Sequence, residues 1–216
     1  MKFSCEKALL LSAINTAGRA VAAKSSIPAL EGILAEADSH GLRLTGYNLE
    51  TGITTLIEAE VVQEGSLVLS ARLFGEIVRK LPDDVVSVST DGNNVSIVCG
   101  PTSFDIVGSD PREFPELPEG NTLSISQEKL KSMISRVIFA VSDNESRPIH
   151  TGALFEVEGE ELTMVAVDGY RLALRREAIS GKEGAGTFSF VVPGAALSEV
   201  EKICSDCDQA VSITEG

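Results

Sequence analysis

The sequence predicts an α+β protein that contains two tandem copies of one module, each with two helices packed on antiparallel sheets. Three observations support this prediction. Long segments of the two halves match each other, each copy reads as strand, helix, hairpin, strand, helix, strand, and a proline-rich connector at residues 109–121 separates the copies. A copy of about a hundred residues is the size of a small domain. We therefore expect one domain at residues 1–118 and a second at residues 119–216.

The repeat is clearest between GILAEADSHGLRLTGYNLE, which starts at Gly32, and GALFEVEGEELTMVAVDGY, which starts at Gly152. These segments match at a spacing of 120 residues, which pairs Asn48 with Asp168. Three further matches follow the same order: residues 1–14 with 123–136, residues 66–81 with 188–203, and residues 85–89 with 210–214. Their spacings are about 122, 122 and 125 residues. One matching stretch could arise by chance, whereas four in the same order predict a duplication.

Hydrophobic periodicity and capping residues place the elements of each copy. Apolar residues at helical spacing predict a first helix from Glu6 to about Ala17. Ser70 is a candidate N-cap for a second helix that ends near Leu81. In the second copy Ser126 is the candidate cap, residues from Lys129 onward are expected to be helical, and Pro193 is expected to be the first residue of the other helix. Short apolar or alternating runs predict strands at residues 1–5, 34–37, 42–45, 66–69 and 85–89.

Composition favours a soluble protein with a core in each copy. The chain is 43% hydrophobic but has no run near the ~18 apolar residues of a membrane span. The N-terminus lacks a signal-peptide pattern, so we expect a cytoplasmic protein without membrane contacts. Of the four cysteines, Cys204 and Cys207 form a single C-x-x-C, which we interpret as a helix end and the loop after it.

No motif in the sequence predicts catalysis, and we expect no metal and no cofactor. The two histidines, His40 and His150, have no Cys or Asp partner at a familiar spacing, and no phosphate-binding glycine loop is present. Asp206 and Asp208 lack a third carboxylate motif that would complete a metal site.

The charges are segregated by element. The chain carries a net charge of −14, which by itself argues against nucleic acid. The helical segments with their flanking loops, at residues 1–30, 72–80, 123–137 and 193–202, nevertheless hold eleven Lys or Arg and only five Glu. Helices that line one surface would therefore give an acidic protein one positive face, which suits a phosphate backbone.

The repeat, its element order and its charge segregation resemble the bacterial DNA sliding clamp, the beta subunit of DNA polymerase III. The resemblance covers essentially the whole chain and rests on specific segments in family order: MKFSCEKALLLSAI, IPALEGILAEADSHGLRLTGYNLE, LSARLFGEIVRKLP, FPELPEG, TGALFEVEGEELTMVAVDGYRLA and FVVPGAALSEV. It implies the processivity fold, in which three such domains make a protomer and two protomers close a ring around duplex DNA. It also implies that the second domain is incomplete at its C-terminus and that the third domain is absent.

The resemblance implies a polymerase processivity factor that is not itself an enzyme. Its expected partners are double-stranded DNA without sequence preference, the DNA polymerase III catalytic subunit, the clamp loader, and other polymerases and repair proteins that carry short linear motifs. The full-length protein is expected to be a homodimer. A protein-binding repeat scaffold without a DNA role is the alternative.

The resemblance and the basic helices together suggest three sets of site residues. The expected DNA contacts are Lys24, Arg72, Arg79, Lys80, Arg136, Asn144, Arg147, Pro148 and Ile149, the last two standing where some members have tyrosines. The partner-peptide pocket is expected to include His150, Thr151, Val167, Gly169, Tyr170, Arg171 and Leu172, with His150 replacing a commonly apolar residue. The VDGYRL segment alone would predict only a strand and a turn, with Arg171 paired to a carboxylate. A dimer interface is expected at the strand of residues 103–107, which places Phe104 and Ile106 on one face.

Overall fold

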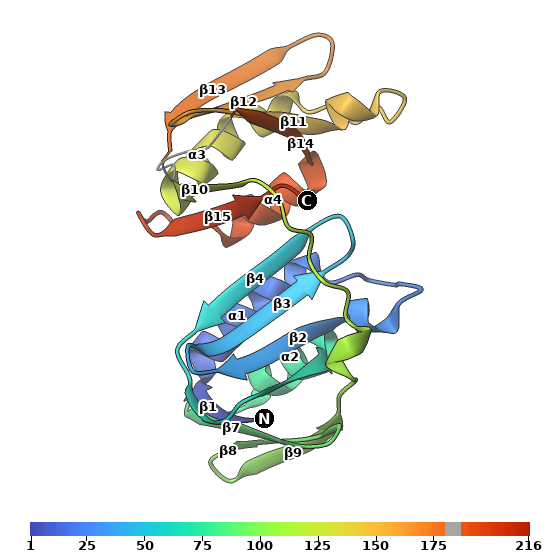
Figure 1. Ribbon diagram of the computed structural model, residues 1–216, viewed down its shortest axis with the longest axis vertical. Helices are drawn as coiled ribbons and strands as arrows, with labels where there is room; N and C mark the ends of the chain where they lie inside the picture. The colour runs from blue at the N-terminus through green and yellow to red at the C-terminus, as the bar shows by residue number, and fades with distance from the viewer. Residues whose placement is uncertain (180–186) are drawn as a thin grey trace. The chain divides into compact units, whose positions relative to one another are not determined.

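The protein forms two compact units, Met1–Leu117 and Pro118–Gly216. The computed structural model describes residues 1–179 and 187–216. Within each unit, two α-helices lie against one face of a four-stranded antiparallel sheet (Figure 1). None of the helices in the described residues has the length and apolar character that crossing a membrane would require.

The first unit contains two antiparallel sheets, ordered β5-β1-β7-β8-β9 and β4-β3-β2-β6. Its helices are α1 (Lys7–Ala17) and α2 (Ala71–Lys80), and short 3-10 turns follow α1 at Gly18–Ala20 and Pro28–Glu31. Its strands are β1 (Lys2–Glu6), β2 (Gly32–Asp38), β3 (Gly41–Tyr47), β4 (Gly52–Ile57), β5 (Glu60–Gln63), β6 (Gly65–Ser70), β7 (Val85–Asp91), β8 (Asn94–Cys99) and β9 (Thr102–Val107).

The core of the first unit lies between the helices and the inner faces of the strands. Alternate residues of β2, such as Ile33 and Ala35, are fully buried and share one cluster with Leu10 of α1 and Phe74 of α2. At Gly46, an added Cβ would lie 2.0 Å from the carbonyl oxygen of Ala17. The glycine therefore lets α1 pack directly against the backbone of β3.

The second unit repeats this arrangement with fewer strands. Its helices are α3 (Gln127–Val137) and α4 (Gly194–Ile203), with 3-10 turns at Ile138–Ala140 and Pro148–Thr151. Its strands form sheets ordered β13-β12-β11-β14 and β10-β15. They are β10 (Thr122–Ser126), β11 (Gly152–Glu158), β12 (Glu161–Val167), β13 (Leu172–Ala178), β14 (Phe188–Pro193) and β15 (Ala210–Thr214).

Strand pairing corrects two of the four spacings read from the sequence. Lys2 pairs with Ser89 and Thr122 with Thr214, so the N-terminal segments correspond at 120 residues, not about 122. Gly32 pairs with Ser70 and Gly152 with Pro193, so the third segments correspond at 123 residues, not 122. For the third segments, a one-residue slip would turn every side chain to the opposite face, so only the spacing of 123 residues puts the buried residues of both copies on the core face.

The helix starts follow the sequence predictions with two exceptions. Glu6 was predicted to begin the first helix, but it is the extended last residue of β1, and α1 begins at Lys7. The hydroxyl oxygens of Ser70 and Ser126 accept hydrogen bonds from the backbone N–H of Leu73 and Lys129, both at 3.4 Å, which confirms both caps. Pro193 was predicted as the first helical residue, but it is the extended last residue of β14, and α4 begins at Gly194. Its ladder pairing with Gly152 holds it in the strand. The sequence patterns did not predict β4, β5, β8 or β13.

Candidate nucleic-acid and peptide interfaces

One side of α2 presents basic side chains to solvent. The helix buries Phe74, Gly75, Ile77 and Val78, and its basic residues stand on the exposed side. Arg79 and Lys80 in its last turn are exposed and form no ion pair with any described residue. Arg72 in the first turn is also exposed, but its Nε lies 3.3 Å from the Glu76 carboxylate one turn later. The free cations of α2 are therefore concentrated at its C-terminal end.

Two loops that correspond in the repeat carry further expected DNA contacts. Lys24 and Asn144 stand at the same place in their units, 120 residues apart, each between two 3-10 turns, and both are exposed. The Asn144 side-chain oxygen already accepts hydrogen bonds from the N–H and hydroxyl of Ser146, at 3.0 and 2.6 Å. That oxygen organises the loop, and the amide nitrogen of Asn144 donates no hydrogen bond to a described residue.

The neighbouring expected contacts of the second unit are also exposed. Arg136 lies in the last turn of α3, and Arg147, Pro148 and Ile149 follow the Asn144 loop. No ion pair within the described part of the chain engages Arg136 or Arg147, so both guanidinium groups are available to phosphate.

Several other basic residues of the helical segments are neutralised within their own unit. Lys7 donates to the Leu81 carbonyl at 2.6 Å and to Asp83 at 2.8 Å. Lys131 lies 3.0 Å from Asp206, and Lys202 lies 2.6 Å from Glu199. The charge count from the sequence therefore overstated the free positive charge, because at least four of its eleven basic residues, these three and Arg72, lie in ion pairs with described residues.

The VDGYRL segment forms a tight turn held by one carboxylate. Asp168 accepts hydrogen bonds from the backbone N–H of Tyr170 at 2.9 Å and of Arg171 at 3.0 Å, and from Arg171 Nε at 2.7 Å. These contacts, led by the Tyr170 N–H, lower the pKa of Asp168 to about 2. Gly169 has a φ of 92°, a left-handed conformation that suits glycine, and the Tyr170 side chain after it is fully exposed. The pairing of Arg171 with a carboxylate, expected from the segment alone, is confirmed.

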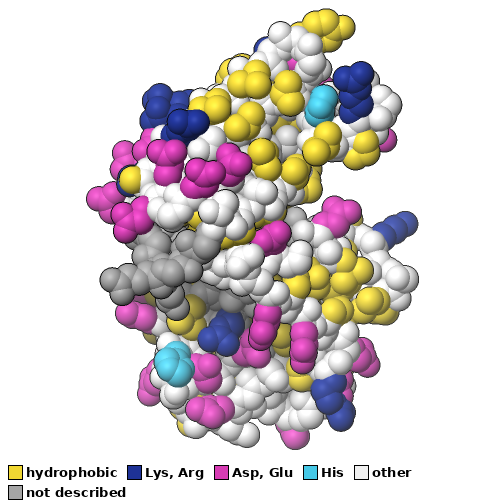
Figure 2. Space-filling model, turned by 45° about the horizontal axis from the view of Figure 1, so that its top comes forward, with side chains coloured by type: hydrophobic (Ala, Val, Ile, Leu, Met, Phe, Trp, Pro, Cys, Tyr) yellow, Lys and Arg dark blue, Asp and Glu magenta, His cyan; other side chains and the backbone are white. Residues whose placement is uncertain are grey.

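Apolar side chains adjoin this turn on the outer face of the sheet β13-β12-β11-β14, the face turned away from α3 and α4. Strand pairing places Leu174, Val165, Leu154 and Val191 side by side across the four strands. We call these four residues the outer apolar row. Leu174 is 50% exposed, and Leu172, which pairs with Val167 next to the row, is 63% exposed. Figure 2 shows apolar side chains gathered on this unit, in the upper part of the view.

The remaining expected pocket residues lie in the 3-10 turn before β11. The His150 N–H donates to the Arg147 carbonyl at 2.9 Å, and the Thr151 hydroxyl donates to the Pro148 carbonyl at 2.7 Å. Within the described residues, no hydrogen bond or ion pair joins His150 to the Asp168 turn.

Two parts of this surface were missed from the sequence. Phe139 is exposed, and the Arg171 guanidinium lies 5.8 Å above its ring. The outer apolar row was also missed. The alternation of Leu172 and Leu174 was the available signal for it, because such a pattern predicts a strand with apolar residues on its solvent side.

The expected dimer strand lies at the edge of a sheet. β9 is the outermost strand of β5-β1-β7-β8-β9, so one side of its backbone has no ladder partner among the described residues. Phe104 and Ile106 lie on one face of it, with Phe104 37% exposed and Ile106 partly packed on the core.

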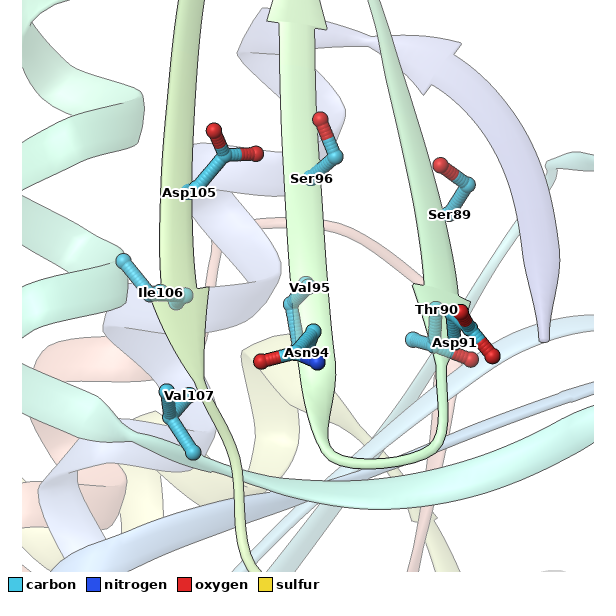
Figure 3. Close-up of a pocket in the computed structure, with 9 residues that line it drawn as sticks. All are labelled: Ser89, Thr90, Asp91, Asn94, Val95, Ser96, Asp105, Ile106 and Val107. Atoms are coloured by element: carbon cyan, nitrogen blue, oxygen red, sulfur yellow. The ribbon is translucent and has the colours of Figure 1, made fainter.

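A shallow depression lies beside this edge on β7, β8 and β9. Figure 3 shows Ser89, Ser96 and Asp105 side by side on these three strands. The lining contains two carboxylates, Asp91 and Asp105, and no lysine or arginine. The depression therefore does not suit an anionic ligand.

The described residues contain no group of three His, Cys, Asp or Glu that could hold a metal ion. All four cysteines are free. Cys204 is the buried cap residue at the end of α4, and burial raises the pKa of its thiol, whereas Cys207 lies in the following loop. This geometry agrees with a structural interpretation of the C-x-x-C segment.

Two family models match the chain. The N-terminal domain of the DNA polymerase III beta subunit matches residues 1–118, and the central domain of that subunit matches residues 124–216. The beta sliding clamp of Bacillus subtilis is 36% identical over 99% of this chain, and that of Halalkalibacterium halodurans is 35% identical over 99%. The chain spans 59–60% of the length of these two relatives.

Solved structures give the same result. The DNA polymerase sliding clamp of Bacillus subtilis superposes with a TM-score of 0.88 at 35% identity, covering 100% of this chain and 60% of that one. A sliding clamp of Pseudomonas aeruginosa, solved bound to griselimycin, gives a TM-score of 0.86 at 26% identity over 100% of this chain and 60% of that one. With both of its units matched by consecutive domain models, the chain belongs to the DNA polymerase III beta subunit family.

Proposed function

We propose that this protein is a DNA polymerase processivity factor, a sliding clamp that encircles duplex DNA and tethers the replicative polymerase. Residues 1–118 and 119–216 would be its first two clamp domains. The observation that carries the proposal is the unpaired basic end of α2, Arg79 and Lys80, in a chain whose two units both match clamp domains. Basic side chains on a helix contact phosphates and read no base, so a ring lined by such helices can slide.

DNA binding is assigned to the exposed basic helix ends and the two corresponding loops. Arg79, Lys80 and Arg136 would supply charge from the helices, and Lys24 and Arg147 would supply it from the loops. Arg72 would contribute less because its ion pair with Glu76 partly neutralises its charge. Pro148 and Ile149 can contribute apolar contact only, because neither side chain has a hydrogen-bond donor.

Partner binding is assigned to the second unit. The exposed Tyr170 and Leu172, with the outer apolar row beside them, form an apolar surface with a few polar groups, which suits the anchors of a short peptide. His150, Thr151, Val167, Gly169 and Arg171 would border it. The proposed partners are the DNA polymerase III catalytic subunit, the clamp loader, and other polymerases and repair proteins with short linear motifs.

The full-length protein would be a cytoplasmic, non-catalytic homodimer that needs no cofactor. Its protomers would pair through the free edge of β9, where Phe104 and Ile106 stand. An open strand edge with apolar side chains is a ready template for pairing with another strand.

Retention on DNA tests the clamp function. The full-length protein, assembled on nicked circular plasmid by its clamp loader, should co-elute with the DNA through gel filtration and should dissociate when the plasmid is linearised. A topological link explains this difference, because a ring can leave only over an end. Equal retention on circular and linear DNA would contradict the proposal, and no retention on either would favour a scaffold without a DNA role.

A peptide titration tests the partner surface. A synthetic peptide with the polymerase's clamp-binding motif should perturb NMR signals of Tyr170, Leu172 and Val167. Tyr170→Ala should weaken binding, whereas Val98→Ala, an equally simple truncation on the first unit, should not. Perturbation confined to residues elsewhere would reject the assignment.

A further inference from the structure

The exposed side of α2 holds one carboxylate among three cations. Successive residues of an α-helix are rotated by about 100°, so one arc of about 100°, turned away from the buried side, holds all four charged residues of α2: Arg72, Glu76, Arg79 and Lys80. Glu76 lies near the middle of this arc, four residues after Arg72 and three before Arg79. The one negative charge of α2 therefore lies inside the surface that is proposed above to contact DNA.

Glu76 is already engaged with one of these cations. Its Oε1 lies 3.3 Å from Nε of Arg72, and the two side chains are 50% and 89% exposed. An ion pair this exposed is weak, because water and salt screen it and both side chains lose freedom when they form it. A DNA phosphate that approaches α2 must therefore compete with the carboxylate for Arg72, and it can displace that carboxylate.

The second helix of the other unit carries a carboxylate at the same position. The spacing of 123 residues that strand pairing sets ahead of α2 and α4 makes Glu199 the counterpart of Glu76. Glu199 Oε1 lies 2.6 Å from Nζ of Lys202, so it also engages a cation of its own helix. Both units thus keep an ion-paired carboxylate at one corresponding position, although its partner precedes it in α2 and follows it in α4.

An ion pair within a phosphate-binding surface lowers the affinity of that surface for DNA. A cation that is already paired contributes less to the release of counterions when DNA binds, and this release is the main source of non-specific affinity. A ring that is held on DNA by its topology does not need strong contacts. Weak contacts suit it better, because each one must break and re-form as the ring moves along the duplex.

We propose that Glu76 limits the affinity of the DNA-binding surface by withholding Arg72 from phosphate. Arg79 and Lys80 then supply the standing contacts of α2, and Arg72 supplies a contact only when it leaves Glu76. This inference rests on the proposed function, because it assigns a role to one acidic residue within the surface that is proposed to bind DNA.

The first experiment removes the charge of Glu76 and keeps the size of its side chain. Glu76→Gln in the full-length protein should raise the affinity for duplex DNA roughly two- to fivefold, the range that one exposed ion pair supports. The log–log salt slope should steepen by up to about 0.9, because Arg72 gains a phosphate contact. Fluorescence anisotropy of one labelled duplex at several salt concentrations measures both quantities.

The matched control removes the same charge from the other side of the first unit. Glu36 lies on the outward face of β2, directly opposite Arg43 in the β2–β3 ladder. Glu36→Gln therefore also takes an acidic neighbour from an arginine, but away from the helices, and it should change neither the affinity nor the slope. An effect of Glu36→Gln equal to that of Glu76→Gln would reduce the result to net charge and would overturn the proposal.

A double-mutant cycle tests whether the effect passes through Arg72. In the background Arg72→Gln, the substitution Glu76→Gln should lose most of its effect on affinity and slope, because no withheld cation remains to be released. The same gain with and without Arg72 would overturn the proposal. Glutamine is a good helix former, and unchanged hydrogen exchange at the buried Ile77 and Val78 of α2 would show that the helix is intact in every variant.

Failure of this inference is distinguishable from failure of the proposed function. If the unchanged full-length protein is retained on circular plasmid but Glu76→Gln leaves the salt slope unaltered, only the inference is rejected. If the unchanged protein is not retained on circular plasmid, the clamp function is rejected and the inference with it.

Discussion

At the scale of single residues, Asn48 and Asp168 show one turn built twice. Asn48 accepts hydrogen bonds from the N–H of Glu50 and Thr51 at 3.0 and 2.7 Å, just as Asp168 does from the two corresponding residues of its own turn. Both turns contain a residue with positive φ, Leu49 at 75° and Gly169 at 92°. The pairing of Asn48 with Asp168 in the sequence is therefore structural, and only the second turn adds a charge, which orients Arg171.

The charge of Asp168 predicts a pH dependence of this turn. Hydrogen bonds from the Tyr170 and Arg171 N–H groups and the Arg171 side chain hold its pKa at about 2, below the ordinary value of 3.8. A carboxyl with a lowered pKa stabilises the folded form above its ordinary pKa, and that stabilisation is lost as the pH falls from 3.8 through about 2. The Tyr170 and Arg171 amide signals should therefore titrate in this acidic range.

Asp168→Asn should abolish that titration. Asp110, whose pKa the side chain of Arg112 lowers to about 2, provides the internal control and should titrate in both proteins. Persistence of the Tyr170 titration in the variant would show that another group controls the turn.

The backbone of Gly169 gives a second residue-scale prediction. Space around it is open, so Gly169→Ala meets no neighbour and is penalised only by its φ of 92°. We expect a loss of about 1 kcal/mol, measured by hydrogen exchange at the paired amides of β12 and β13. Gly18→Ala is the matched control, because Gly18 also has open space but a φ of −60°, and it should cause no loss.

At the scale of elements, α2 shows which features the hydrophobic periodicity of the sequence predicts and which it does not. The cap at Ser70 and the buried positions Phe74 and Ile77 follow from local sequence. Which cations remain free does not, because Glu76 lies about one turn from Arg72, Arg79 and Lys80 alike, and only the structure shows that it pairs with Arg72. The strands missed from the sequence illustrate the same limit. β4 and β13 are edge strands of their sheets and pair on one side only. Several of their residues are exposed, so polar and apolar side chains do not alternate regularly along them.

The free end of α2 predicts a specific change in DNA affinity. Arg79→Ala in the full-length protein should weaken duplex binding uniformly across sequences and lower the log–log salt slope by about 0.9, because one phosphate contact is lost. Fluorescence anisotropy at several salt concentrations measures this slope. Arg43→Ala removes the same charge from β3 of the same unit, on the sheet face away from the helices, and should leave the slope unchanged. Equal slopes for the two variants would remove α2 from the DNA surface.

At the scale of the whole molecule, the edge strand β9 predicts association of the full-length protein. Phe104→Asp places a charge on the exposed apolar side chain of this edge and should shift a dimer toward monomer in analytical ultracentrifugation at micromolar concentration. Val98→Asp, on the neighbouring strand β8 and on the other face, is the control and should stay dimeric. A full-length protein that is already monomeric at this concentration would contradict a stable ring.

The sequence by itself determined the duplication, the α+β composition of each copy, the serine caps and, through its resemblance to a known family, the residues to inspect. These properties are carried by local periodicity and by matches along the chain. Tertiary structure decided the rest. Strand pairing set the spacings of 120 and 123 residues between the copies, ion pairs determined which cations stay free, and Phe114 and Leu117 packed onto the outer face of the first unit's four-stranded sheet. Strand register and packing depend on contacts between residues far apart in the chain, which no local pattern could have fixed. Some ion pairs, such as Arg72–Glu76, join near neighbours, and there the folded structure decides which of several possible partners is used.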